Sequence, residues 1–205
     1  MTTYFLVITV VMSVIALQNE TVFRKLIFNP YLVYHRKEWY RFFSSGLIHA
    51  DFIHLAINMF VFYSFGRLLE FYYQVTFGLR GEILFVILYV SGFLMSLLPT
   101  YNSNKLNPAY NGLGASGSVS AVVFACIFFD PLQPITFYFA INLPGIIFGV
   151  LYLVYGYYMG KRGGDNVNHS AHNWGALYGI LFTVVMKPSL IIDFFEKLIF
   201  FRNNI

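Results

Sequence analysis

Apolar residues in this chain gather in long runs that are separated by short polar segments. A helix rises about 1.5 Å per residue, so about 20 residues cross a hydrocarbon core of about 30 Å. The pattern therefore predicts an all-α integral membrane protein that folds as a compact bundle of six transmembrane helices. The predicted spans cover residues 1–17, 46–66, 83–99, 115–129, 135–159 and 171–186.

Two further segments mix apolar and charged residues and are expected to lie along the membrane surface. Residues 18–45 combine aromatic side chains with Arg24, Lys25 and other bases, which is typical of an interfacial segment. Residues 189–203 alternate Leu, Ile and Phe with charged residues, which favours an amphipathic tail helix over a seventh crossing. The chain is thus expected to form a single membrane domain over residues 1–205.

The composition agrees with this interpretation. The 205 residues are 58% hydrophobic and 11% charged, with a mean hydropathy of +0.65, whereas soluble domains carry roughly 25% charge. The net charge of +4 is scattered and forms no basic tract, so we expect no nucleic-acid partner. The first run lacks the basic start of a secretory signal, which favours a retained helix. The single Cys126 excludes an intrachain disulfide.

Polar side chains within the predicted spans mark candidate chemistry, because ionisable groups are costly inside a membrane. Ionisable groups and clustered polar residues collect in the second, fourth and sixth spans. The second holds His49, Asp51, His54 and Asn58, the fourth opens with Ser116, Ser118 and Ser120, and the sixth opens with His169, Ser170, His172 and Asn173. Alternate spans of a serpentine chain cross in the same direction, so depths within them can be compared.

Three of these residues are predicted to lie at one depth. His54 precedes the polar stop Arg67 by thirteen residues, Ser116 precedes Asp130 by fourteen, and His172 precedes Lys187 by fifteen. At about 1.5 Å per residue, all three lie about 20–22 Å from the same membrane face. In a core about 30 Å thick, they share a level roughly 8–10 Å below the other face.

Two ridges of small residues predict that the fourth and sixth spans touch. Their members lie four residues apart, as Gly117, Ala121 and Ala125 in one span and Ala171, Gly175 and Gly179 in the other. Such ridges let helix backbones approach closely. The contact would bring a hydroxyl, Ser116, to an imidazole, His172, as a nucleophile and its general base.

Further groups surround this predicted pair. Because Ser116 begins its span, free backbone N–H groups there can stabilise an oxyanion. His54 and Asn58 share a helix face and could add donors, or they could only hold helices together. His49, five residues before His54, is expected to point elsewhere, and both His49 and His169 are expected to be structural or surface groups.

Other readings are weaker. Trp39 and Arg41 are interpreted as interfacial anchors. Neither Asp51 nor Asp165 has a spacing that places it behind His172, which favours a dyad over a triad. The histidines show neither a His-x3-His nor a His-Glu-x2-His helix motif, so we expect no metal and no cofactor.

At these residues the chain resembles the rhomboid intramembrane serine proteases in their basic six-helix form. The motifs that carry the resemblance span residues 39–179. They are Trp39-Tyr40-Arg41, His49-x4-His54-x3-Asn58, Gly66-x3-Glu70, Gly114-Ala115-Ser116-Gly117 and Ala171-His172-x2-Gly175-x3-Gly179.

The resemblance implies an enzyme, a serine endopeptidase, with Ser116 as nucleophile and His172 as general base. It implies an oxyanion site made by His54, Asn58 and the Ser116 backbone. It also implies single-pass membrane proteins as substrates, cut in or near their transmembrane segment, and a bacterial inner or plasma membrane as the location. The alternatives are a catalytically silent member that binds membrane proteins and, more remotely, a small transporter.

Two features depart from the family pattern. Members often carry an aromatic residue one turn after the serine, against the imidazole, where this chain has Ser120. If this chain has the usual bacterial orientation of the family, more of its Lys and Arg residues lie outside the membrane than inside. This distribution opposes the positive-inside rule. We retain that orientation because several of these bases lie in the interfacial segment 18–45.

Overall fold

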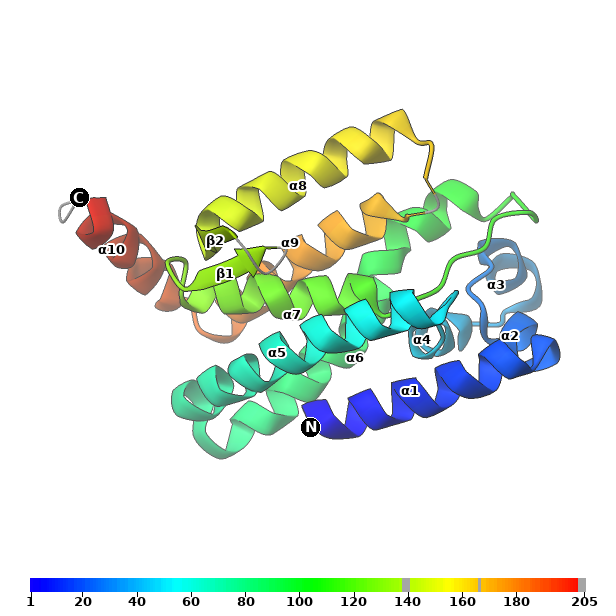
Figure 1. The fold of residues 1–205 in the computed structure, drawn as a ribbon, viewed down its shortest axis with the longest axis horizontal. Coiled ribbons are helices and arrows are strands. Elements are labelled where there is room, and N and C mark those ends of the chain that lie inside the picture. Colours follow the sequence, from blue (N-terminus) through cyan, green and yellow to red (C-terminus); the bar gives the residue numbers. More distant parts are fainter. Residues whose placement is uncertain (138–140, 166, 203–205) are drawn as a thin grey trace.

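The computed structural model describes residues 1–137, 141–165 and 167–202, and most of them are helical. Long helices lie side by side around a central one, with shorter helices at one end of the bundle (Figure 1). The long helices are α1 (Thr2–Gln18), α5 (Phe52–Phe77), α6 (Gly81–Asn104), α7 (Ser116–Phe129), α8 (Gly145–Arg162) and α9 (His169–Met186).

The core of the molecule is α7. Every residue from Gly117 to Phe129 is buried, because α5, α6 and α9 pack around this helix. A helix that is apolar on all sides has no face for water and takes the centre of a bundle. Ser116 is its first residue and is partly exposed, so the hydroxyl at the start of the central helix remains reachable.

Helices α5 and α6 form a hairpin that turns through the short 3₁₀ helix η2 (Gly78–Arg80). The rings of Phe62 in α5 and Tyr89 in α6 stack with centroids 4.3 Å apart. Judged by length and apolar composition alone, one helical stretch of the described residues is fit to cross a membrane, and it is Phe52–Asn104. Because the chain folds back at η2, this stretch contains two antiparallel helices.

The first loop forms a cap of short helices at the end of the bundle where α7 begins (Figure 1). It contains α2 (Glu20–Leu26), α3 (Pro30–Arg36), α4 (Arg41–Ser44) and η1 (Ser45–Leu47). Asn19 and Asn29 start α2 and α3 by accepting hydrogen bonds from backbone N–H groups. A bridge between Phe28 and Gly112 joins this cap to the loop that leads into α7.

The second predicted span was misplaced at both ends. Residues 46–51 precede α5, which starts after the N-cap Asp51, whose Oδ1 accepts from the His54 N–H at 2.7 Å. The helix then continues past the predicted stops, Arg67 and Glu70, as far as Phe77. Glu70 is paired there, accepting from the Thr2 backbone N–H at 2.9 Å, so its charge does not end the helix.

The third predicted span also runs further than expected. Helix α6 passes through Pro99 and ends at Asn104, so residues 100–104 are not part of a polar loop. Proline removes one helix hydrogen bond, and nearby polar groups add others. The Thr100 carbonyl accepts from Asn104 Nδ2 at 3.0 Å, and its hydroxyl accepts from Asn168 Nδ2 at 3.0 Å.

The fifth predicted span, 135–159, was wrong in its first part. Strands β1 (Pro134–Phe137) and β2 (Ile141–Pro144) form an antiparallel hairpin with Ile135 opposite Leu143 and Thr136 opposite Asn142. Proline is compatible with the first residue of a strand and with the start of a helix, and Pro144 is the N-cap of α8. Residues 138–140 of this prediction lie outside the described residues.

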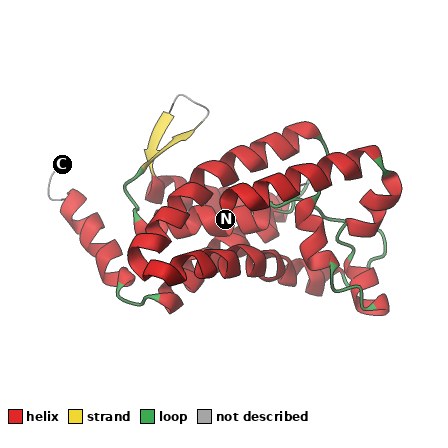
Figure 2. Cartoon of the chain, turned by 90° about the horizontal axis from the view of Figure 1, so that it is seen from below, coloured by secondary structure: helices red, strands yellow, loops and turns green. Residues whose placement is uncertain are grey.

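The tail predicted over 189–203 appears as α10 (Leu190–Arg202), and residue 203 lies outside the described part. Its axis is bent by 113° from α9, so it does not continue that helix. Figure 2 shows α10 pointing away from the bundle, near the hairpin. This direction agrees with a tail along a surface, whereas the six-span bundle as a whole remains a prediction.

Candidate active site

The N-terminus of α7 presents unpaired backbone donors. The first helical hydrogen bond runs from the Val119 N–H to the Ala115 carbonyl at 2.9 Å. The N–H groups of Ser116, Gly117 and Ser118 therefore have no acceptor within the helix. The cap residue Ala115 has no side-chain oxygen to take one of them. An anionic oxygen placed there would meet both these donors and the positive end of the helix dipole.

The hydroxyl of Ser116 faces the imidazole of His172, with Oγ 2.6 Å from Nε2. His172 lies in the first turn of α9, and both side chains are partly exposed. A neutral imidazole that accepts this O–H hydrogen bond at Nε2 can also remove the proton. The pair thus has the geometry of an activated nucleophile.

Backbone contact between α7 and α9 sets this distance. A Cβ on Gly175 would lie 2.0 Å from the Gly117 carbonyl oxygen, and one on Gly179 would lie 2.1 Å from the Ala121 oxygen. Only glycine allows two helices to meet so closely. The structure therefore brings together the two ridges of small residues that were recognised in the sequence.

His54 lies beside the loop that enters α7. Gly114 has φ +104, a conformation that favours glycine, and a Cβ there would lie 2.9 Å from Cε1 of the His54 ring. Asn58 is buried, and its Nδ2 donates to the His54 carbonyl at 3.0 Å. No hydrogen bond among the described residues joins Asn58 to Ser116.

His49 was expected to point away from this group, and that expectation was wrong. Its buried ring meets His54 edge-on with centroids 4.9 Å apart. Its Nε2 accepts from the Ala115 N–H at 3.4 Å, and its Nδ1 lies 3.0 Å from Ser13 Oγ. Residues 46–51 precede α5, so helical spacing could not place His49.

Tyr152 of α8 contacts the imidazole. Its ring stacks near that of His172, with centroids 6.4 Å apart and planes 21° apart. Its hydroxyl lies 2.7 Å from Ser120 Oγ, which donates to the Ser116 carbonyl at 2.8 Å. The sequence analysis did not identify Tyr152. Its signal in the sequence was the absence of an aromatic residue at position 120, which left open whether a ring from another helix or none would hold His172.

No carboxylate among the described residues binds His172. Asp165 instead accepts from His169 Nε2 at 2.9 Å, and this hydrogen bond lowers the pKa of the Asp165 carboxyl below its usual value. His169 is buried and meets His172 edge-on, with ring centroids 6.1 Å apart. The two aspartates that were considered as a third catalytic group have other partners. Asp51 caps the start of α5, and Asp165 binds His169.

A protein-family model for the Rhomboid domain matches residues 36–189, which is most of the chain. This chain belongs to the rhomboid family. No curated protein sequence matches it. Rhomboids are membrane proteins, and the family typically consists of serine intramembrane proteases that act on membrane-protein substrates within the bilayer.

Two further rhomboid motif residues, Trp39 and Arg41, lie in the cap of short helices, whereas Glu70 lies far along α5 and binds the Thr2 N–H. Trp39 is half exposed and packs against Phe42 and Tyr101, with ring centroids 6.2 and 5.9 Å away. Arg41 was interpreted as a surface anchor, but it is buried. Its guanidinium donates to the carbonyls of Arg24 at 3.1 Å and Ile27 at 2.6 Å, so it ties α4 to the end of α2.

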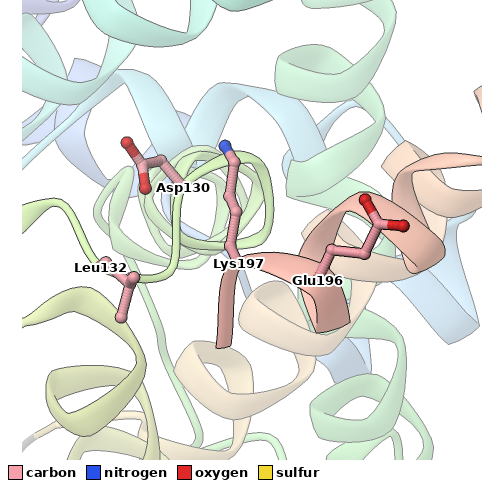
Figure 3. A pocket seen from close by; sticks show the side chains of 4 residues that line it. All are labelled: Asp130, Leu132, Glu196 and Lys197. Atoms are coloured by element: carbon pink, nitrogen blue, oxygen red, sulfur yellow. The ribbon is translucent and has the colours of Figure 1, made fainter. Parts of the chain in front are cut away.

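A cavity at the far end of α7 lies away from Ser116 and His172. It has a volume of about 360 Å³ and is lined by Asp130, Leu132, Glu196 and Lys197 (Figure 3). Lys197 Nζ donates to the Phe129 carbonyl at 2.7 Å, at the far end of α7. At about 1.5 Å per residue, the 14 residues of α7 separate this cavity from Ser116 by about 20 Å. The cavity therefore takes no part in the site.

Among the described residues, no group of three or more His, Cys, Asp or Glu side chains is arranged to hold a metal ion. The groups available at the start of α7 are the Ser116 hydroxyl, free backbone N–H groups and the nearby imidazoles of His49, His54 and His172.

Proposed function

We propose that this rhomboid is an intramembrane serine endopeptidase that cuts single-pass membrane proteins in or near their transmembrane segment. The observation that carries the proposal is the 2.6 Å contact between Ser116 Oγ and His172 Nε2 at an uncapped helix start. A hydroxyl, a base and oxyanion donors within one turn of each other are the minimum for acyl transfer.

In the proposed mechanism, His172 accepts the hydroxyl proton while Ser116 Oγ attacks the carbonyl carbon of the scissile peptide. The negative oxygen that results is bound by the Ser116 N–H and by side chains from α5, with His54 and Asn58 as the candidates. The protonated His172 then donates its proton to the leaving amine as the C–N bond breaks. Water attacks the acyl-enzyme with His172 again as base, which releases the acid and restores Ser116.

We further propose that α1, α5, α6, α7, α8 and α9 all cross the bilayer as one multi-pass domain in a bacterial inner or plasma membrane. The 14 residues of α7 span about 21 Å, less than the core of about 30 Å. A helix this short would leave Ser116 recessed below one face, where water reaches it from above. The short helices α2–α4 and the bent α10 would lie at the two interfaces.

The substrate must be unwound locally before cleavage, because the peptide groups of a transmembrane helix are already hydrogen-bonded. Small or helix-breaking residues near the cut would lower this cost. The loop before α9 contains Gly163 and Gly164 at positive φ values, +63 and +104. Such a loop can change its path when α8 moves, and we propose that this movement admits the substrate.

The decisive experiment uses the purified chain in bilayers and a fluorescent fluorophosphonate, which reacts covalently with activated serines. Wild type should be labelled, whereas Ser116→Ala should not be labelled and His172→Ala should be labelled at least 100-fold more slowly. Ser170→Ala is the matched control, since Ser170 is an exposed serine in the same turn of α9 as His172. Equal labelling of wild type and Ser116→Ala would refute the assignment of the nucleophile.

Cleavage of a reconstituted single-pass substrate then separates the enzyme from the two alternatives. A silent binding member would retain such a protein without cutting it and would not react with the phosphonate. A transporter would show neither labelling nor cleavage but would move a solute across sealed vesicles. Loss of cleavage in Ser116→Ala, with wild-type folding, supports the protease.

A further inference from the structure

The nucleophile is connected to α8 by a directed chain of hydrogen bonds. Ser120 Oγ donates to the Ser116 carbonyl at 2.8 Å. Because the Ser120 proton is used in this bond, the Tyr152 hydroxyl, 2.7 Å away, is the donor to Ser120 Oγ. The chain therefore runs from Tyr152 through Ser120 to the backbone of Ser116.

The same tyrosine also limits the movement of the general base. The Tyr152 ring lies along one side of the His172 imidazole, with planes 21° apart. Among the described residues, no hydrogen bond holds the imidazole of His172 other than the one to Ser116. The Tyr152 ring and the hydrogen bond to Ser116 Oγ together leave the His172 imidazole little freedom to rotate.

Helix α8 packs less extensively against α7 than α9 does. Its outward face is exposed and apolar, at residues that include Val150, Val154 and Tyr158. Toward α9 it makes a hydrogen bond from Asn173 Nδ2 to the Leu153 carbonyl at 3.1 Å, beside Gly156. The position of the Tyr152 ring is therefore set by side-chain contacts that can be broken one at a time.

On the basis of the proposed protease function, we infer that Tyr152 is a positioning residue, which aligns Ser116 with His172 only while α8 is docked. Any displacement of α8 that admits a substrate also withdraws the ring from His172 and breaks the hydrogen bond to Ser120. The dyad is then misaligned until α8 returns. The enzyme so arranged acts after the helix closes, which keeps the open state from reacting with water or unselected chains.

Two readouts in bilayers test this inference. The rate of labelling by a small fluorophosphonate reports on the dyad alone, and cleavage of a transmembrane substrate reports kcat and KM. Tyr152→Leu should slow labelling about 10- to 100-fold and lower kcat by a similar factor, because small displacements of reacting groups have effects of this size. Tyr152→Phe keeps the ring and should recover most of the labelling rate.

The hydrogen-bond chain is tested by a double-mutant cycle. Tyr152→Phe and Ser120→Ala should each slow labelling about 3-fold, and the double variant should be no slower than the slower single variant, because both remove the same chain. Tyr158→Phe and Tyr158→Leu are matched controls on the exposed face of α8 and should label like wild type. Thermal unfolding of each variant establishes that it is folded, and the Phe and Ala variants preserve the test if the Leu variant does not fold.

The outcomes separate this inference from the proposed function. If Tyr152→Leu labels as fast as wild type while Ser116→Ala is unlabelled, the inference is refuted and the protease stands. If Tyr152→Leu labels normally but cleaves faster, Tyr152 is only a latch for α8, which also refutes it. If wild type and Ser116→Ala are equally unreactive, the proposed function fails instead.

Discussion

Helices α8 and α9 both contribute to the site at the start of α7, but they are attached in different ways. α9 meets α7 through glycines, with Gly175 and Gly179 directly against the carbonyls of Gly117 and Ala121. α8 is attached through the ends of side chains, such as the Tyr152 hydroxyl on Ser120. Backbone contact fixes a distance rigidly, whereas a side-chain contact can be made and broken. The distance between Ser116 and His172 is thus set within the core, whereas their alignment depends, in our proposal, on the docking of α8.

The backbone contact between α7 and α9 should be more sensitive to mutation than the side-chain contacts of α8. Gly179→Ala would place a Cβ 2.1 Å from the Ala121 carbonyl oxygen, so α7 and α9 must separate. We expect a loss of about 3 kcal/mol in the free energy of unfolding, at the upper end for overpacked cores, and labelling slowed at least 100-fold. Denaturant unfolding in detergent micelles measures the first effect. The contrast between the helices would be wrong if this variant kept both properties.

Gly160→Ala is the matched control, since its Cβ would lie 3.6 Å from His169 Cβ, an ordinary contact distance. Adding a methyl group at a helical glycine without a clash raises helix stability by up to about 1 kcal/mol. Labelling should be unchanged.

Substitution of His49, which binds the loop leading to Ser116, should have the next largest effect. His49→Phe removes the acceptor of the Ala115 N–H and the partner of Ser13. A buried donor left without an acceptor costs about 1–3 kcal/mol, and the loop leading to Ser116 should loosen. We expect kcat to fall about 10-fold with little change in KM. His35→Phe is the control, because His35 is an exposed histidine at the same end of the molecule; equal effects of the two variants would contradict a specific role for His49.

Loosening α8 should affect activity more than stability. Gly156→Ala would place a Cβ 2.3 Å from Asn173 Oδ1. The amide is displaced and loses its bond to Leu153, so α8 moves off α9. We expect a change below about 1 kcal/mol in unfolding free energy, with labelling slowed about 5-fold. A stability loss as large as that of Gly179→Ala would mean that α8 is as firmly packed as α9.

The smallest effect is expected for Asp165, in the loop that joins α8 to α9. Because the hydrogen bond from His169 lowers the pKa of Asp165 in the folded protein, folding favours its carboxylate form. That contribution is present above the unfolded value of about 3.9 and is lost as pH falls through the lower folded value. Asp165→Asn should lower the melting temperature by under about 2 °C at pH 6, and the difference should shrink as the pH falls below the unfolded value. The exposed Asp193→Asn should show no such pH-dependent difference.

Part of the fold followed from local sequence, and part did not. The start of α7 at Ser116 and the ridges of small residues could be recognised because both are short-range patterns. The hairpin at 134–144 was interpreted as a span because its residues are apolar, although Pro134 and Pro144 mark its two ends. Helix α5 was ended too early at Arg67, because Glu70 has a partner in a distant segment, the backbone N–H of Thr2, that no local pattern shows.

The sequence by itself predicted which residues could carry chemistry and at what depth they would lie. Hydropathy fixes where apolar runs begin and end, and helical rise converts the distance from a polar stop into depth. Only the tertiary structure decided which side chains hold them. Tyr152 reaches His172 from a different helix, and His49 reaches Ala115 from a turn that has no helical period. Contacts between distant segments depend on how helices rotate and cross, and no local pattern contains that information.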